Sequence, residues 1–169
     1  MSNWLPITEY SFKNRISVRE YSSKPVEKEK LEKMVDAGHL APTARGEQPW
    51  EFIIVTNKEK VKELAEITDH GKFMAGAAAS IVIFCKDTKY YLEDGCSAAE
   101  NVLLAAAAQG VASCWIAGDK KHYAPAIAKA IGVPENYKLI SVISLGYPVE
   151  KPQPHQKRPL KEVIHWEKF

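Results

Sequence analysis

The sequence predicts a layered fold in which helices pack on the faces of a β-sheet, of the α/β or α+β class. Four short apolar runs, largely β-branched, are typical of buried strands, and amphipathic segments with a period of 3.6 residues alternate with them. A length of 169 residues is enough for one domain with its own core. With 46% hydrophobic residues and a net charge of +2, disorder is excluded and a nucleic-acid binder is disfavoured.

Apolar residues that recur every three or four positions predict the helices. These helices span 26–41, 58–67, 93–109 and 122–131, with a weaker helix over 7–15. Pro42, Gly110 and Gly132 end three of them, because proline cannot continue a helix and glycine readily adopts the conformation that closes one. The many alanines in 93–109 indicate close packing against another helix or a partner chain.

The predicted strands are the continuous apolar runs, which indicate burial on both faces. They span 52–55, 81–85, 111–116 and 137–146. An extended segment is predicted over 17–21, and a loop rich in turn-forming residues over 42–49. From Pro148 a proline-rich tail is expected to run extended over a surface, ending in a short helix or an added strand within 160–169.

The sequence lacks the motifs of several function classes. The chain has no G-x-G-x-x-G after its first predicted strand, so a Rossmann dinucleotide site is unsupported. Three cysteines and five histidines are scattered without ligand spacing, which argues against zinc and against disulfides and favours a reducing, cytoplasmic location. No signal peptide is expected, and the uncharged stretch 101–118 is interpreted as helix, turn and strand, not a membrane span.

The segment Arg15-Ile16-Ser17-Val18-Arg19 is a candidate phosphate site. In an extended chain Arg15, Ser17 and Arg19 project to one side, and two guanidiniums with a hydroxyl match phosphate oxygens. The simpler alternative is a pair of solvated surface arginines.

Positive charge is concentrated in two segments far apart in the sequence. Residues 11–24 hold four cations and one acid, residues 151–161 hold four cations and no acid, and the rest of the chain is net negative. Such segregation indicates an anion site, with a solvated basic tail as the alternative.

The predicted strand 111–116 leads into Gly118, where backbone N–H groups can approach a flat ligand closely. Lys72, after Gly71, is a further candidate cation. Cys114 has no cationic neighbour in sequence that would activate it, so a nucleophilic role is disfavoured.

Four motifs, in this order along nearly the whole chain, resemble those of the nitroreductase family of flavin mononucleotide (FMN) oxidoreductases. They are RISVREY at 15–21 with KPV at 24–26, APTARGEQPW at 41–50, AAENVLLAA at 98–106 with GVASCWIAG at 110–118, and LGYP at 145–148 with KRPL at 157–160. The resemblance implies an α+β, three-layer fold with a mostly antiparallel sheet flanked by helices. It also implies an intertwined homodimer, one domain over 1–169, and a tail over 148–169 that packs on the partner.

The resemblance implies a set of cofactor-binding residues and no catalytic side chain. They are Arg15, Ile16, Ser17, Arg19, Pro42, Thr43, Ala44, Gln48, Lys72, Ile116, Ala117, Gly118, Lys157 and Arg158. The first segment and the tail would hold the flavin phosphate and ribityl chain, and the loop over 42–48 would come from the partner. Ala117 and Gly118 would aim N–H groups at the flavin ring, and Lys72 would lie near its pyrimidine side.

The sequence departs from the family pattern in two places. Gly46 stands where the family commonly has Asn, and Glu47 adds a negative charge beside it. The stretch between Cys85 and Asp94 is very short, so the helices that cover the substrate in larger members are expected to be missing.

The resemblance implies an oxidoreductase that transfers electrons from NADH or NADPH through FMN to a nitroaromatic or quinone by a ping-pong mechanism. Two alternatives remain open at this point: a flavin carrier or sensor without turnover, suggested by Gly46, and an anion-binding domain without flavin.

Overall fold

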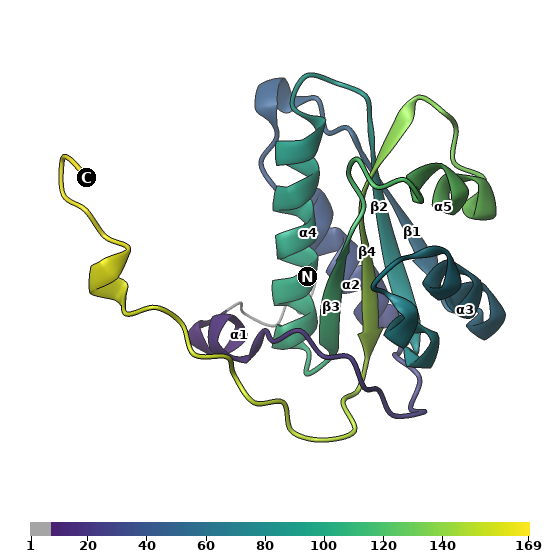
Figure 1. Ribbon diagram of the computed structural model, residues 1–169, viewed down its shortest axis with the longest axis horizontal. Coiled ribbons are helices and arrows are strands. Elements are labelled where there is room, and N and C mark those ends of the chain that lie inside the picture. The colour runs from purple at the N-terminus through teal and green to yellow at the C-terminus, as the bar shows by residue number, and fades with distance from the viewer. Residues whose placement is uncertain (1–7) are drawn as a thin grey trace.

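A computed structural model describes residues 8–169 (Figure 1). Within them four strands form one sheet: β1 (Trp50–Val55), β2 (Ala79–Lys86), β3 (Ala112–Ala117) and β4 (Tyr137–Gly146). The strand order is β1-β2-β4-β3 and each neighbouring pair is antiparallel, which confirms the predicted antiparallel character. The order leaves β3 as an edge strand, whose outer side meets an isolated bridge from Ser17 to Ser113.

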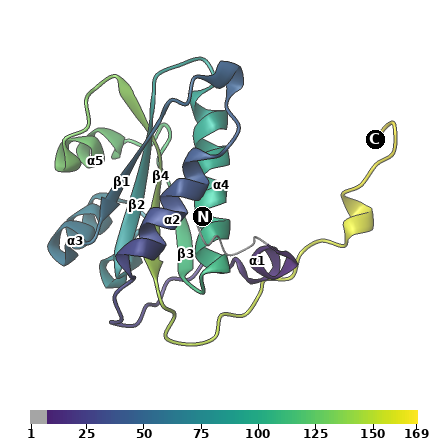
Figure 2. The same ribbon diagram turned by 180° about the vertical axis from the view of Figure 1, so that it is seen from behind.

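Helices cover both faces of the sheet and give three layers (Figures 1 and 2). α2 (Lys28–His39) and α4 (Tyr91–Ala108) lie on one face, and α3 (Lys58–Ile67) and α5 (Ala124–Ile131) lie on the other. The short α1 (Glu9–Asn14) lies beside the end of α4 that precedes β3. The chain after β4 runs past α1 and away from the sheet (Figure 1).

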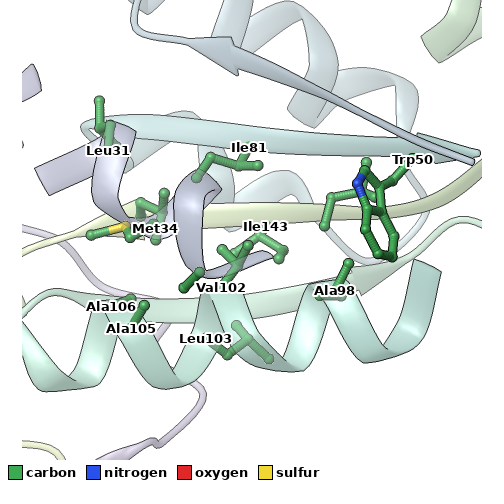
Figure 3. Packing of buried hydrophobic residues seen from close by; sticks show 14 of the residues in the cluster. Leu31, Met34, Trp50, Ile81, Ala98, Val102, Leu103, Ala105, Ala106 and Ile143 are labelled. Atoms are coloured by element: carbon green, nitrogen blue, oxygen red, sulfur yellow. The ribbon is translucent and has the colours of Figure 1, made fainter. Parts of the chain in front are cut away.

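Small residues allow α2 and α4 to pack closely on the sheet, as the alanine content of 93–109 predicts. Figure 3 shows Ala98, Ala105 and Ala106 of α4 in this core with Met34 of α2. A Cβ on Gly38 would lie 2.8 Å from a ring carbon of Phe52, so only glycine fits there without displacement.

The opposite face has a core of its own. Val61 and Leu64 of α3 and Ile127 of α5 are buried against Phe84 and other residues of the sheet. The side chain of Asn57 accepts a hydrogen bond from the N–H of Lys60 at 2.9 Å and so caps α3. At the other end of this layer Gly132, with φ of 73°, ends α5 as the sequence predicts.

Element boundaries differ from the predictions by a few residues. Two 3₁₀ turns were not predicted, η1 (Ala44–Gly46) and η2 (Lys72–Gly76). The last segment forms only the 3₁₀ turn η3 (Leu160–Glu162), neither a longer helix nor a strand. Ile7, the first residue of the helix predicted over 7–15, lies outside the described residues. Among residues 8–169 no helix is long and apolar enough to cross a bilayer.

Candidate functional site

The segment that precedes α2 is attached along the ends of β3 and β4. The N–H of Val18 donates to the carbonyl of Ser113 at 3.0 Å, and the N–H of Ser22 donates to the carbonyl of Tyr147 at 2.8 Å. Val18 is buried while Arg19 is exposed, the alternation of an extended chain with one side on the protein. The predicted extended conformation over 17–21 is therefore present, as bridges to the sheet and not as a full strand.

Tyr21 fixes this segment in place, a role that sequence reasoning missed. Its hydroxyl donates to the carbonyl of Val18 at 2.6 Å and shares a hydrogen bond of 2.7 Å with the Ser144 hydroxyl. Burial raises the pKa of Tyr21 far above its usual range, so the phenol stays neutral. A Cβ on Gly146 would lie 2.7 Å from the tyrosine ring, and this close approach explains the glycine.

The bridge from Ser17 to Ser113 brings the segment with Arg15, Ser17 and Arg19 near Cys114 on β3. Burial raises the pKa of the Cys114 thiol, while the charge of Arg19, the Ser17 hydroxyl and the charge of Arg15 oppose that rise. Within the described chain, Arg19 has no carboxylate partner; its guanidinium lies 5.6 Å from the ring centroid of Phe73. The Arg15 guanidinium lies 3.9 Å from a carboxylate oxygen of Glu100, at the edge of ion-pair distance.

The cluster continues on both sides of these arginines. Ile16 and Arg15 line a cavity of about 190 Å³ together with Lys151 and Pro152, so the root of the basic tail reaches the first basic segment. Lys72 is exposed and precedes Phe73, the ring that Arg19 contacts.

Gly71 packs against Ile116: a Cβ added to Gly71 would lie only 3.2 Å from a methyl group of Ile116. This contact holds the start of η2 beside β3. Lys72 and Ile116, both predicted site residues, therefore belong to the same region of the molecule.

The free edge of β3 exposes one of the two N–H groups predicted to face a ring. In the β3–β4 register Ala117 lies opposite Ser141, and the N–H of Gly118 donates to the carbonyl of Ile140 at 3.0 Å. Antiparallel strands bond at alternate residues, so the N–H of Ala117 points to the free edge. The N–H of Gly118 is engaged with β4, so of the two N–H groups expected to face a ring only that of Ala117 lies on the outer edge; its contact with a ring stays a prediction.

The loop with Pro42, Thr43, Ala44 and Gln48 lies at the other end of α4. The N–H of Ala44 donates to Asp94 in the first turn of α4 at 2.9 Å, whereas the arginine segment is attached at Ser113, after that helix ends. Figure 1 shows the loop and α1 near opposite ends of α4. The structure therefore does not bring these loop residues to Arg15, Ser17 and Arg19 within one chain.

Three residues of this loop have left-handed backbone conformations. They are Arg45, Gly46 and Gln48, with φ of 60°, 67° and 46°. A Cβ on Gly46 would meet no atom within 4 Å, so the space beside it is open.

The predicted phosphate ligands Lys157 and Arg158 are exposed on the tail, and no hydrogen bond or ion pair within the described residues joins them to Arg15, Ser17 or Arg19. The guanidinium of Arg158 donates to the carbonyl of Glu162 at 2.9 Å and lies 3.7 Å from the carboxylate of the same residue. Both segments are basic, and the first residues of the tail reach the first segment: Pro148 bridges to Tyr21, Val149 donates to the Glu20 carbonyl, and Lys151 lines the cavity with Arg15.

The donor set fits FMN, the cofactor that the resemblance implies. Two guanidiniums, one of them without a carboxylate partner, and a hydroxyl suit a phosphate, and the Ala117 N–H on an open strand edge suits a carbonyl or ring nitrogen. Glu100 brings a carboxylate close to one of these donors, Arg15. In the described part of the chain, no group of three or more His, Cys, Asp or Glu side chains could hold a metal ion.

Two family models match the chain. The nitroreductase family model matches residues 12–90, and the model described as "Putative TM nitroreductase" matches residues 61–169. A curated relative from Archaeoglobus fulgidus, named "Putative NADH dehydrogenase/NAD(P)H nitroreductase", is 37% identical over 81% of this chain and 83% of its own length.

Solved structures agree with these matches. One from Bacteroides thetaiotaomicron carries the same name, with 34% identity, a TM-score of 0.89 and coverage of 94% of this chain and 96% of that chain. An "FMN-dependent Nitroreductase" from Clostridium difficile has 32% identity, a TM-score of 0.90 and coverage of 96% and 100%. On these matches and on the antiparallel sheet with its two helical layers, the chain belongs to the nitroreductase family.

Proposed function

We propose that this protein is an FMN-dependent oxidoreductase that transfers electrons from NADH or NADPH to a small acceptor such as a nitroaromatic or a quinone. The observation that carries the proposal is the attachment of the Arg15–Arg19 segment to the outer side of β3, through the Ser17–Ser113 bridge and the Val18 N–H. A phosphate donor set and an unpaired backbone N–H on one strand suit the two ends of a flavin nucleotide. The names of the relatives, NAD(P)H nitroreductase and FMN-dependent nitroreductase, support the same activity.

FMN supplies the hydride and single-electron chemistry that no side chain of this protein has. Arg15, Ser17 and Arg19 bind its phosphate, and the Ala117 N–H orients the ring edge. Lys72 contributes a positive charge near the ring, which favours the more negative, reduced form. No side chain is assigned a proton-transfer or nucleophilic step, which agrees with the buried, poorly acidic thiol of Cys114.

A homodimer completes the site. The loop over 42–48 and the arginine cluster lie near opposite ends of α4. Both can therefore contact the same flavin only if the loop comes from a second chain. The tail carries exposed apolar side chains and leaves the sheet; among them are Leu160, Val163, Ile164 and Trp166, the last 79% exposed. A second copy would bury them, which is the usual reason for such a patch on a stable protein. In this assembly the whole chain, 1–169, is assigned to a single domain, and residues 148–169 form an arm that packs on the partner.

A ping-pong order suits this open site. The chain lacks a Rossmann fingerprint, so the nicotinamide has no separate dinucleotide domain and docks over the same flavin face as the acceptor. Donor and acceptor therefore occupy the site in turn, and the donor product leaves first. The short connection between β2 and α4 leaves little cover over that face, which favours acceptors of varied shape.

The experiment starts from the visible absorption of the purified protein with FMN. Anaerobic NADH or NADPH should bleach the flavin band, and a nitroaromatic or quinone should restore it. Double-reciprocal plots at several acceptor concentrations should be parallel. A yellow protein that neither nicotinamide bleaches would replace the enzyme with a flavin carrier or sensor, and a protein that takes up no FMN would leave an anion-binding domain.

The position of Gly46 offers a sharper test of the carrier alternative. Its left-handed backbone suits Asn as well as Gly, and the space beside it is open, so Gly46→Asn should fold normally. If the missing amide limits turnover, G46N raises kcat in the reductase assay. A carrier would show no NAD(P)H oxidation in either form.

We also infer a reducing, cytoplasmic location. The three cysteines, Cys85, Cys96 and Cys114, are all free thiols, which suits a reducing compartment. Fractionation of cells that express a tagged chain should recover it with cytoplasmic markers; recovery with an oxidising compartment would contradict the assignment.

A further inference from the structure

A cavity of about 890 Å³ opens directly beyond the end of β3. Gly118 forms part of its wall, next to the Ala117 edge of the candidate flavin site. The other walls come from α5, from the chain that leads into β4 and from Tyr91 at the start of α4. Its volume is within the range of roughly 300–1,000 Å³ that small-molecule and cofactor sites occupy.

The floor of this cavity is apolar and aromatic. Phe84 and Leu139 are buried at its base, and the rings of Tyr91 and Tyr137 are half-buried at its sides. The Tyr91 hydroxyl donates to Asp119 at 2.7 Å, which holds that ring in place. Flat aromatic walls of this kind suit a planar ligand, since rings favour stacked and edge contacts.

The rim of the cavity is cationic. Four lysines and two acids line it: Lys120, Lys121, Lys129, Lys138, Asp119 and Glu135. Lys120 lies 4.0 Å from Asp119 and Lys138 lies 3.2 Å from Asp87, so these two charges are partly balanced. Lys121, Lys129 and Glu135 have no ion-pair partner anywhere in residues 8–169, so the unpaired charges of the rim are two positive and one negative and leave an excess of positive charge.

The turn at Gly118 fixes the cavity close to the strand edge. A Cβ there would lie 2.5 Å from the Leu139 side chain and 2.9 Å from the Ile140 backbone, so a larger residue would push the turn away from β4. Gly118 follows Ala117 directly, so the cavity adjoins the end of β3 at which the Ala117 N–H lies. The Tyr123 hydroxyl, just before α5, donates to the Ala117 carbonyl and ties this end of β3 to the segment that leads into α5.

We propose that this cavity binds the adenosine phosphate half of the nicotinamide dinucleotide, with the base on the aromatic floor and the phosphates at Lys121 and Lys129. This assignment rests on the proposed function, which requires such a donor and leaves it without a Rossmann site. A planar base joined to phosphates matches an aromatic floor with a cationic rim, and the carboxylates of Asp119 and Glu135 can accept hydrogen bonds from the ribose hydroxyls or the amino group of the base.

The direct test is calorimetric titration of ADP and of adenosine 2′,5′-bisphosphate into protein saturated with FMN, so that the flavin phosphate site is filled. Charge reversal in Lys121→Glu with Lys129→Glu should weaken binding at least about tenfold. The matched control is Lys58→Glu with Lys62→Glu on α3, which also reverses two exposed lysines but lies away from the cavity. Equal affinity in K121E/K129E and wild type, or no binding to wild type, would overturn the proposal.

A kinetic test separates this cavity from the flavin site. Reduced nicotinamide mononucleotide carries the reactive ring without the adenosine half. In wild type the dinucleotide should have the higher kcat/KM, and in K121E/K129E the ratio of the two donors should fall at least about tenfold while K58E/K62E keeps it. A ratio that stays constant in K121E/K129E contradicts the cavity assignment. Failure of both donors to reduce the flavin would refute the proposed function, and the calorimetry would still decide whether the cavity binds a nucleotide.

Discussion

The two basic segments of this protein, 11–24 and 151–161, have similar charge, but the first packs on the sheet and the second is exposed. Around Arg15 and Arg19 the chain is attached to the sheet through Val18 and Ser22, and Tyr21 is fixed to Ser144. From Lys151 to Lys161 most side chains are exposed, and Arg158 finds its partner only four residues away. One segment is part of the domain, and the other leaves it (Figure 2).

The difference arises from where the apolar residues stand. In the first segment the apolar residues Val18 and Tyr21 stand directly beside the cations, and their contacts with the sheet hold the chain in place while Arg19 stays exposed. In the tail the cations come first, and the large apolar residues follow from Leu160 onward. Charge therefore identifies an anion-binding segment, but interleaved apolar residues decide whether it is ordered on its own chain. The predictions below test this contrast, from the largest expected effect to the smallest.

Removal of both guanidiniums from the ordered segment should have the largest effect. Each charged hydrogen bond to a phosphate contributes about 1.5–3 kcal/mol, so Arg15→Ala with Arg19→Ala should raise the dissociation constant of FMN at least about 100-fold. Quenching of flavin fluorescence measures it. Lys13→Ala is the control, because Lys13 belongs to the same segment and pairs with Glu9. An affinity within a few-fold of wild type would show that the arginines are only solvated surface residues.

Removal of the unattached segment should act on assembly. Deleting residues 155–169 takes away the exposed apolar side chains, each of which contributes about 1.5–3 kcal/mol if it is fully buried in a dimer. Even one such contact predicts a dimer dissociation constant at least about tenfold higher, which sedimentation can measure. Lys157→Gln with Arg158→Gln keeps the apolar residues and should leave a dimer with weaker FMN binding. A truncated chain that dimerises like the full one would rule out the arm.

The anchor of the ordered segment should contribute to stability. Tyr21→Phe removes the hydroxyl that bonds the Val18 carbonyl and Ser144, so the free energy of unfolding should fall by about 1–2 kcal/mol in urea titrations. FMN binding should weaken several-fold as well, because Ser17 and Arg19 flank Val18. Tyr10→Phe is the control, since Tyr10 is 62% exposed. Equal losses in both variants would mean that the Tyr21 hydroxyl does not position the segment.

The hydrogen bond between Tyr147, at the start of the tail, and Glu27 should make a small, pH-dependent contribution to the stability of the folded state. The Tyr147 hydroxyl donates to Glu27 at 2.6 Å, and this bond, helped by Lys30, lowers the pKa of Glu27 from 4.5 to about 2. A lowered carboxyl pKa stabilises the folded state above the unfolded value of 4.5, and this contribution is lost as pH falls toward 2.

Tyr147→Phe should therefore reduce stability at neutral pH and flatten its decline between pH 4.5 and 2. Thermal unfolding at each pH measures the difference, which stays small because Glu27 is exposed to solvent. A stability difference that persists unchanged down to pH 2 would assign the effect of Tyr147 to packing and not to this bond.

Much of the fold follows from sequence periodicity. The four apolar runs became the four strands, and the alanine-rich segment became α4, because these signals depend on residues within one element. The 3₁₀ turns η1 and η2 escaped prediction. Arg45 takes a left-handed conformation that its residue type disfavours, and Gly71 packs on Thr68, three residues away, as well as on the distant Ile116. A long-range contact such as that with Ile116 leaves no local pattern.

The site was predictable to a different degree in each part. The spacing of Arg15, Ser17 and Arg19 predicts their common side, and the structure brings their segment near Cys114. The engagement of Gly118 with Ile140 required the strand register, which the sequence does not specify. The role of Tyr21 required Ser144, more than 100 residues away. The cavity beyond Gly118 depends on the packing of α5 over β4 and had no sequence signal.

The outer side of β3 links vitamin supply to the amount of usable protein. The Ser113 and Ala117 carbonyls on that side accept hydrogen bonds from Val18 and Tyr123, but the Ala117 N–H has no partner within the described residues. An incompletely paired strand edge is a template for adding strands from other molecules, which is how many β-proteins aggregate. A flavin over Ala117 would cover that template as well as serve the reaction. Overproduction in riboflavin-starved cells should therefore yield more inclusion bodies than in supplemented cells, and cofactor loading would act as a check on folding quality.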